Sequence, residues 1–157
     1  TQGVSSAASD VYKRQVAAQL KPEGDIGRVW TMSRALTYRS IDQLVERDMV
    51  VPVAEEQGIA GGNRTVYKCT RKGSAAIRKW LQAPVPHLRD LRSELLLKLV
   101  IGEATGIDLT GMIAEQTHIV AAQLSVMRTE LKRSPDDAVL RWRVESADAA
   151  LRFLNRL

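Results

Sequence analysis

The sequence predicts a mainly α-helical fold that carries one small β-hairpin. Apolar residues recur at intervals of three and four along most of the chain, which is the spacing of one helix face. Runs rich in β-branched residues flank a glycine-rich stretch in one place, between residues 50 and 70. A hydrophobic content of 45% over 157 residues is enough to bury the core of one domain or of two small ones.

Positive charge is concentrated in the first half of the chain. Residues 1–86 hold 13 Lys and Arg against 8 Asp and Glu, whereas residues 87–157 hold 10 of each. A pI near 9.7 with this asymmetry favours a polyanionic partner for the first half, and nucleic acid ahead of a membrane surface. Charge alone, however, fits an ordinary soluble protein with a modest excess of lysine and arginine equally well.

The sequence contains no candidate membrane span. Its longest apolar stretch, residues 95–101, is interrupted by Lys98 and is far too short to cross a bilayer, and the first residues show no apolar signal core. Cys69 is the only cysteine, which excludes an internal disulfide and fits a reducing compartment. We therefore expect a cytoplasmic protein with no membrane partner.

Residues for catalysis or metal binding do not occur in a recognisable pattern. His87 and His118 lie far apart in the sequence, without a carboxylate or thiol at ligand spacing. Gly58, Gly61 and Gly62 lack the spacing and the following helix of a nucleotide-binding loop. We therefore expect no enzyme, no catalytic or metal-binding residue and no cofactor.

A short helix is expected over about residues 10–21. Tyr12, Val16 and Leu20 repeat at every fourth position, and Pro22 ends the apolar stripe because proline cannot continue a helix. The proline- and glycine-containing stretch that follows predicts a turn.

Ser33 is a good N-cap for a second helix that has two different faces. Its buried stripe is expected to contain Thr37, Ile41, Leu44 and Asp48, broadened by Val45 and Met49. Its other face is expected to present Arg34, Tyr38, Arg39 and Asp42. Hydrogen-bonding and cationic side chains would then project from the first two turns of this helix.

A β-hairpin is expected after the second helix. Its strands are the runs at 50–53 and 65–70, its tip contains the glycines at 58, 61 and 62, and Pro52 favours an edge position for the first strand. Thr70 can then cap a further helix that ends at the Pro84-Val85-Pro86 break. The buried side of that helix is expected to contain Gly73, Ile77, Trp80 and Leu81.

Three helical segments are expected beyond the break, at about 89–101, 109–133 and 136–157. In the second and third segments the apolar residues alternate spacings of four and three, as in heptad repeats. Ser134 as a cap and Pro135 at the first helical position would join these two tightly, so that they run antiparallel.

Helix, turn, capped helix, hairpin and helix is the element order of a winged helix-turn-helix. A B-DNA major groove of about 12 Å admits one α-helix, whose N-terminal residues meet the base edges. The candidate DNA-binding residues are Ser33, Arg34, Tyr38 and Arg39 on the second helix, and Asn63, Arg64 and Lys68 on the hairpin. Tyr38 could instead pack at the base of the helix, and the hairpin residues could be ordinary polar side chains.

Three motifs in this order resemble the PadR family of transcriptional regulators. They are the run SRALTYRSIDQL at 33–44, the Gly61-Gly62 pair followed by VYKCT at 66–70 with Gly73, and the run LRSELLLKL at 91–99. The similarity covers about residues 16–157. Residues 1–15 do not resemble the apolar first helix of the family, and we expect this atypical segment not to be native.

The resemblance implies a two-fold symmetric homodimer, mostly a repressor, that binds double-stranded DNA and in some members responds to a small-molecule effector. Residues 16–84 would form the winged helix-turn-helix domain, and residues 87–157 the helical dimerisation domain. The candidate dimerisation residues are Val120, Leu124, Met127, Leu131, Leu151 and Leu154.

Each of these expectations has an alternative. The two heptad-patterned helices could bury their apolar stripes only against each other, within one subunit. Trp80 and Trp142 could line an effector pocket, although large aromatic residues on helices more often pack in a core or an interface.

The whole chain could also be a helical protein-interaction module whose winged helix does not bind nucleic acid. An RNA-binding winged helix is disfavoured by the scarcity of aromatic residues for base stacking.

Overall fold

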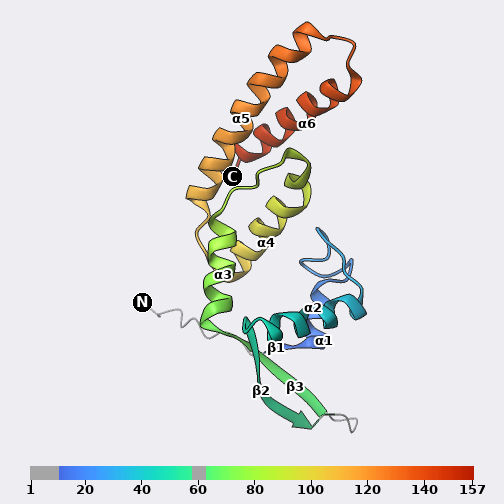
Figure 1. The fold of residues 1–157 in the computed structure, drawn as a ribbon, viewed down its shortest axis with the longest axis vertical. Coiled ribbons are helices and arrows are strands. Elements are labelled where there is room, and N and C mark those ends of the chain that lie inside the picture. Colours follow the sequence, from blue (N-terminus) through green and yellow to red (C-terminus); the bar gives the residue numbers. More distant parts are fainter. Residues whose placement is uncertain (1–10, 58–62) are drawn as a thin grey trace. The chain divides into compact units, whose positions relative to one another are not determined.

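The computed structural model describes residues 11–57 and 63–157, and these form a mainly α-helical protein with one small sheet (Figure 1). The predicted fold class is confirmed. The chain divides into two compact units, one up to Lys79 and the other from Trp80 onward. The division falls inside a helix, ahead of the proline-containing break at 84–86. The predicted glycine tip of the hairpin, at 58–62, lies outside the described residues.

The first unit has the element order expected of a winged helix-turn-helix. Its elements are strand β1 (Val11–Tyr12), helices α1 (Lys13–Gln19) and α2 (Arg34–Glu46), strands β2 (Val50–Gln57) and β3 (Asn63–Cys69), and helix α3 (Arg71–Gln82). The three strands are antiparallel in the order β1-β3-β2, so β2 is an edge strand, as Pro52 predicted. The ladder is irregular between Pro52 and Ala54, where proline cannot donate a hydrogen bond.

The prediction of a helix from about residue 10 was wrong at its start. Val11 and Tyr12 pair with Tyr67 and Val66 of β3, and the helix begins only at Lys13. The extended backbone of β1 supplies hydrogen-bonding partners to the free side of β3, a gain that the four-residue spacing of apolar side chains does not reveal.

Helix α2 begins as predicted and ends earlier than predicted. The Ser33 hydroxyl oxygen accepts a hydrogen bond from the Leu36 amide at 3.3 Å, which confirms the N-cap. Thr37 and Ile41 are buried, as expected. Asp48 was expected on the buried stripe, but it is exposed, lies beyond the helix and has a φ of 58°. This left-handed residue turns the chain toward β2, which ends the helical repeat.

A compact junction joins the end of α2 to the start of α3. The Thr70 amide donates to the Met49 carbonyl at 3.0 Å, and the Thr70 hydroxyl accepts from the Gly73 amide at 3.0 Å, as predicted for a cap. The Lys72 ammonium donates to the Arg47 carbonyl at 2.7 Å. A Cβ at Gly73 would lie 2.1 Å from the Met49 carbonyl oxygen, so only glycine fits here. The hairpin is thereby closed at its base.

The second unit is entirely helical, and its first helical segment is irregular. The expected helix at 89–101 is interrupted: a 3-10 turn, η1 (Leu88–Asp90), and a π-helical turn, η2 (Leu91–Leu95), precede helix α4 (Leu96–Thr105). Gly106, with a φ of 66°, ends α4. Helices α5 (Thr110–Arg133) and α6 (Ala138–Leu154) follow.

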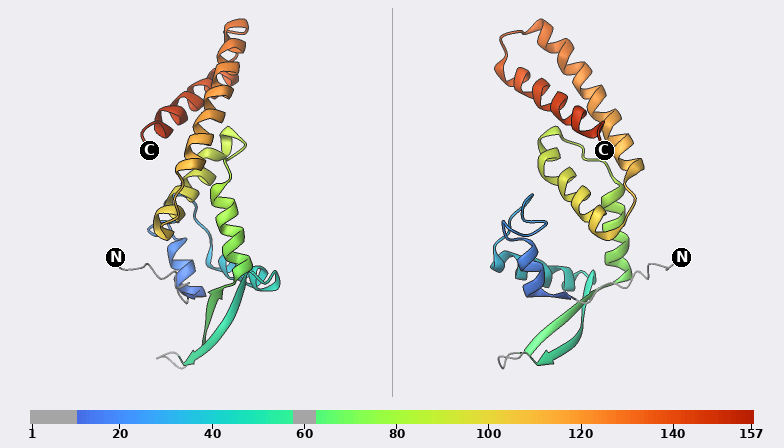
Figure 2. Two further views of the ribbon diagram at one scale, coloured as in Figure 1. Left: turned by 90° about the vertical axis from the view of Figure 1, so that its left-hand side faces the viewer. Right: turned by 180° about the vertical axis from the view of Figure 1, so that it is seen from behind.

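Helices α5 and α6 form the antiparallel hairpin that the sequence predicts (Figure 2). The predicted cap was wrong. The carboxylate of Asp137, not the hydroxyl of Ser134, accepts from the Leu140 amide at 2.9 Å, and α6 begins at Ala138, so Pro135 lies in the loop. Aspartate and serine are both strong N-caps, and the length of the connection between the packed helices selects the later one.

A buried lysine joins α4 to the end of α3. The Lys98 ammonium donates to the Trp80 and Ala83 carbonyls at 2.7 and 2.5 Å, pairs with Glu94 at 3.3 Å and lies 4.7 Å from the centroid of the Trp80 ring. The Trp80 carbonyl lies in the last turn of α3, where it also accepts from the Ala83 amide at 3.3 Å, and Ala83 directly follows the helix. The charge is therefore compensated by a carboxylate and a helix C-terminus.

In the part of the chain that the structure describes, no helix is long and apolar enough to cross a membrane. Residues 11–57 and 63–157 also contain no group of three or more His, Cys, Asp and Glu side chains arranged to hold a metal ion.

We expect Gly73→Ala to lower the free energy of unfolding by about 1–3 kcal/mol, because its methyl group would overlap the Met49 carbonyl. Urea denaturation followed by circular dichroism measures this change. Gly111→Ala is the matched control, since a Cβ at Gly111 meets nothing within 4 Å, and it should be neutral or stabilising by up to about 1 kcal/mol. Equal stabilities of the two variants would contradict the close approach.

Candidate nucleic-acid interface

The buried residues of α2 determine which of its side chains face solvent. Successive residues of an α-helix are rotated by about 100°, so burying Thr37 and Ile41 turns Arg39 to the opposite side. The exposed side chains that share this outward face are Ala35, Leu36, Arg39, Gln43 and the acidic Glu46. Leu36 is 48% exposed although it is aliphatic. Of these residues, the sequence analysis named only Arg39, because the helix boundaries and the buried pair are needed to place the others.

Arg39 lies at the centre of this outward face. Its side chain is exposed and forms no hydrogen bond or ion pair with any residue that the structure describes. Its guanidinium carries five donors in a planar fork, which suits two-point bonding to guanine or phosphate. The outward face of α2 therefore offers a free cation.

Arg34 and Tyr38 lie toward the flank of α2 and contact each other. The Arg34 Nε donates to the Tyr38 hydroxyl at 3.2 Å, and the guanidinium lies 5.2 Å from the centroid of the tyrosine ring. Arg34 is exposed and Tyr38 is half-buried, so the aromatic body packs while its hydroxyl reaches the surface. Tyr38 therefore packs at the base of the helix, which is one of its two roles considered from the sequence. Its contact with DNA stays a prediction.

The first turn of α2 has the form of an anion-binding helix N-terminus. Ser33 is exposed, and its hydroxyl oxygen is engaged by the Leu36 amide. The remaining amides of this turn have no partner within the helix, and the helix dipole adds to their positive potential. A phosphate group at this end would be favoured, with the Ser33 hydroxyl still able to donate to it.

A second cation lies beside α2, and sequence reasoning missed it. Lys13 of α1 forms an ion pair with Asp42, and its ammonium lies 5.8 Å from the Tyr38 ring centroid and 5.4 Å from that of Tyr67. Burial lowers the pKa of Lys13, but the hydrogen bonds with Asp42 and Tyr67 outweigh it and raise the pKa above its usual value. No local pattern signals this pair, because its members are 29 residues apart.

Two of the candidate hairpin residues are accessible on β3. Arg64 and Lys68 are exposed and flank the buried Val66 on the same side of the strand. Asn63 pairs with Gln57 through the backbone, but its side chain lies outside the described part. Among the described residues, no hydrogen bond or ion pair joins Arg64 or Lys68 to the candidate residues of α2.

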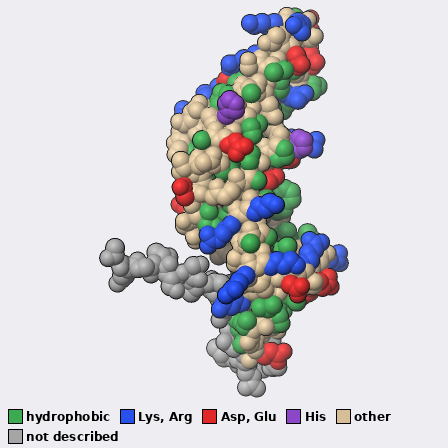
Figure 3. Space-filling view, turned by 60° about the vertical axis from the view of Figure 1, so that its left-hand side comes forward, with side chains coloured by type: hydrophobic (Ala, Val, Ile, Leu, Met, Phe, Trp, Pro, Cys, Tyr) green, Lys and Arg blue, Asp and Glu red, His purple; other side chains and the backbone are tan. Residues whose placement is uncertain are grey.

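One face of the molecule shows how charged and hydrophobic side chains are distributed over the first unit. On the face drawn in Figure 3, lysine and arginine side chains gather around the helices of the first unit, and hydrophobic side chains cover the described part of the hairpin. Val51 and Val53 of β2 are among the exposed hydrophobic residues. The first unit thus combines a cationic surface with the outward face of α2.

The candidate dimerisation residues are packed inside the second unit. Val120, Leu124, Met127 and Leu154 are buried within one chain, and Leu131 and Leu151 pack against the same clusters. The stripes of α5 and α6 therefore bury each other, which is the alternative that the sequence left open. A contribution of these six residues to a dimer stays a prediction.

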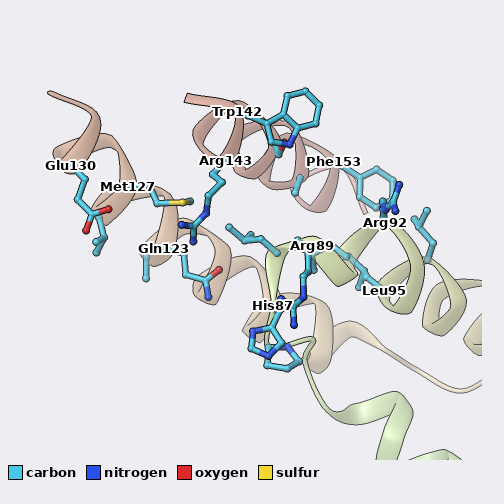
Figure 4. A pocket seen from close by; sticks show the side chains of 18 residues that line it. His87, Arg89, Arg92, Leu95, Gln123, Met127, Glu130, Trp142, Arg143 and Phe153 are labelled. Atoms are coloured by element: carbon cyan, nitrogen blue, oxygen red, sulfur yellow. The ribbon is translucent and has the colours of Figure 1, made fainter. Parts of the chain in front are cut away.

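The second unit also has an open apolar groove, with a volume of about 1490 Å³ (Figure 4). Leu91, Leu95 and Met127 line it, together with the exposed side chains of Trp142 and Phe153. Its charged lining residues are Arg89, Arg92 and Arg143 against Glu130. The groove has more than the usual volume of a small-molecule pocket, which is about 300–1,000 Å³.

Comparison with known proteins finds similarity among solved structures. No protein-family model and no curated protein sequence matches the chain. Among solved structures, the chain is similar to the crystal structure of Bacillus subtilis PadR in complex with operator DNA, with 15% sequence identity and a TM-score of 0.47. The match covers 96% of this chain and 91% of that chain.

Proposed function

We propose that the chain is a DNA-binding transcriptional regulator that inserts α2 into the major groove. The outward face of α2 supports this most directly, because Arg39 is free at its centre while Thr37 and Ile41 hold the opposite side in the core. An α-helix with one buried side and one accessible side that presents a free arginine fits a major groove of about 12 Å. The excess of positive charge in residues 1–86 would attract the phosphate backbone.

The side chains of α2 suit different parts of a duplex. Arg39 can bond guanine through two donors, Gln43 can pair with adenine, and Leu36 can contact a thymine methyl group. Ser33 and Arg34, at the start of the helix, are placed to bind a phosphate. In the hairpin, Asn63, Arg64 and Lys68 would contact the backbone or the neighbouring minor groove.

The proposed regulator acts as a homodimer on a palindromic operator and represses transcription by occupying it. A second copy is the occupant that we propose for the groove of the second unit. Trp142 and Phe153 are large apolar side chains exposed beside it, and covering them in a two-fold interface would remove both from water. Of the two tryptophans that the sequence offered for an effector pocket, Trp142 lines this groove and Trp80 bonds to Glu94 instead. A small-molecule effector bound in the groove would therefore contact Trp142 and not Trp80.

Selection of bound duplexes from a random DNA pool tests the proposed function. We expect an inverted repeat whose half-sites lie about one helical turn apart, 10–10.5 base pairs, because a two-fold dimer presents two copies of α2. Enrichment of no sequence, together with retention of a specific protein in a parallel pull-down, would favour the protein-interaction module instead.

Arg39→Ala should weaken binding to the selected duplex by about tenfold to a hundredfold, since one base contact of this kind contributes roughly 1–3 kcal/mol. Fluorescence anisotropy at several salt concentrations measures this change, and the wild-type affinity should fall steeply with salt. Arg133→Ala removes the same charge from an exposed position near the end of α5 and should leave the affinity nearly unchanged. A wild-type affinity that does not vary with salt would contradict the proposal.

Trp142→Ala should weaken dimerisation by about thirtyfold or more, the loss typical of an aromatic residue at the centre of an interface. Sedimentation equilibrium measures the dissociation constant. Val139→Ala is the matched control, because Val139 is 70% exposed on the same helix but does not line the groove. If both variants dimerise like the wild type, the subunits meet through another surface.

A further inference from the structure

The edge of the proposed DNA-binding face carries a carboxylate. Asp42 lies one helical turn after Tyr38 and next to the outward face of α2, and its side chain is 58% exposed. An uncompensated negative charge there would repel the phosphate groups of a duplex in contact with Arg39. A cation that neutralises Asp42 would therefore favour the proposed function.

Lys13 of α1 occupies the position that neutralises this carboxylate. Besides the ion pair with Asp42, its ammonium faces the rings of Tyr38 and Tyr67, and its side chain is only 22% exposed. The ion pair and the two neighbouring rings leave little of the ammonium accessible to a phosphate. Because the pKa of Lys13 is raised, the ammonium stays charged throughout the neutral pH range.

On the basis of the proposed function, we infer that Lys13 is a positioning residue for DNA binding. It cancels the charge of Asp42 and holds the flank of α2 against α1 and β3, and it does not itself bind a phosphate. The Lys13–Asp42 pair thus adds no net charge to the edge of the outward face. The contribution of Lys13 to affinity consequently depends on the presence of Asp42.

A double-mutant cycle with the full chain and the duplex selected from the random pool tests this inference. Lys13→Met should weaken binding by roughly fivefold to tenfold, because it leaves one unpaired carboxylate beside the duplex. Asp42→Asn should bind as tightly as the wild type or more tightly. The double variant should regain the wild-type affinity, since the pair has zero net charge both in the wild type and in the double variant.

Two further variants separate this role from charge loss and from misfolding. Lys132→Met removes one exposed positive charge from α5 and should change the affinity much less than Lys13→Met does. Lys13→Arg keeps the charge and should retain the affinity. Thermal unfolding of every variant shows whether it is folded. If Lys13→Met is not folded, the inference is tested by the affinities of Asp42→Asn and of the double variant, which should both equal or exceed the wild-type affinity.

Three outcomes would overturn the inference. If the double variant binds as weakly as Lys13→Met, and the dependence of log affinity on log salt falls by about one phosphate contact, Lys13 binds the backbone directly. If Asp42→Asn binds more weakly than the wild type, Asp42 contacts DNA itself. If Lys13→Met binds no more weakly than Lys132→Met, the ion pair has no role in binding. A wild-type protein that binds no duplex would instead overturn the proposed function.

Discussion

The rotation of α2 about its own axis is the constraint on which the candidate interface depends. Thr37 and Ile41 are buried, and the Thr37 hydroxyl also donates to the Ser33 carbonyl at 3.0 Å. With these side chains inside, helix geometry leaves Arg39 outside and puts Asp42 at the edge of the outward face. A shift of one residue in the buried stripe would turn every one of these side chains by about 100° and move the free arginine from the outward face to the flank of the helix.

The second unit depends on buried polar groups that are all satisfied. Besides Lys98, the Gln116 amide bonds both backbone groups of Val85, accepting from its N–H at 2.6 Å and donating to its carbonyl at 3.1 Å. These bonds hold the proline-containing segment after α3 against α5, since a buried backbone group without a partner would be costly. With its polar interior satisfied and the stripes of α5 and α6 paired, the unit still exposes the apolar groove beside Trp142.

The accuracy of the sequence predictions followed the range of the interactions involved. The Ser33 cap, the Thr70 cap and the edge position of β2 depend on residues close in sequence, and all three are confirmed. The packing of α5 against α6 was one of two alternatives, because a heptad pattern shows that a stripe is buried without showing which helix covers it. Arg34 and Arg39 are both exposed as expected, but only the structure distinguishes the arginine bonded to Tyr38 from the free one.

By itself, the sequence determined the order of the main helices and of the hairpin strands, the amphipathic character of α2 and the concentration of positive charge in the first half. Periodicity, capping and charge are local properties, and each can be evaluated from a short window of residues. Only the tertiary structure decided that Val11 and Tyr12 form a strand, that Asp137 caps α6 and that Lys13 pairs with Asp42. These features arise from contacts between segments far apart in the chain, whose energies can exceed local preferences and are absent from any single window.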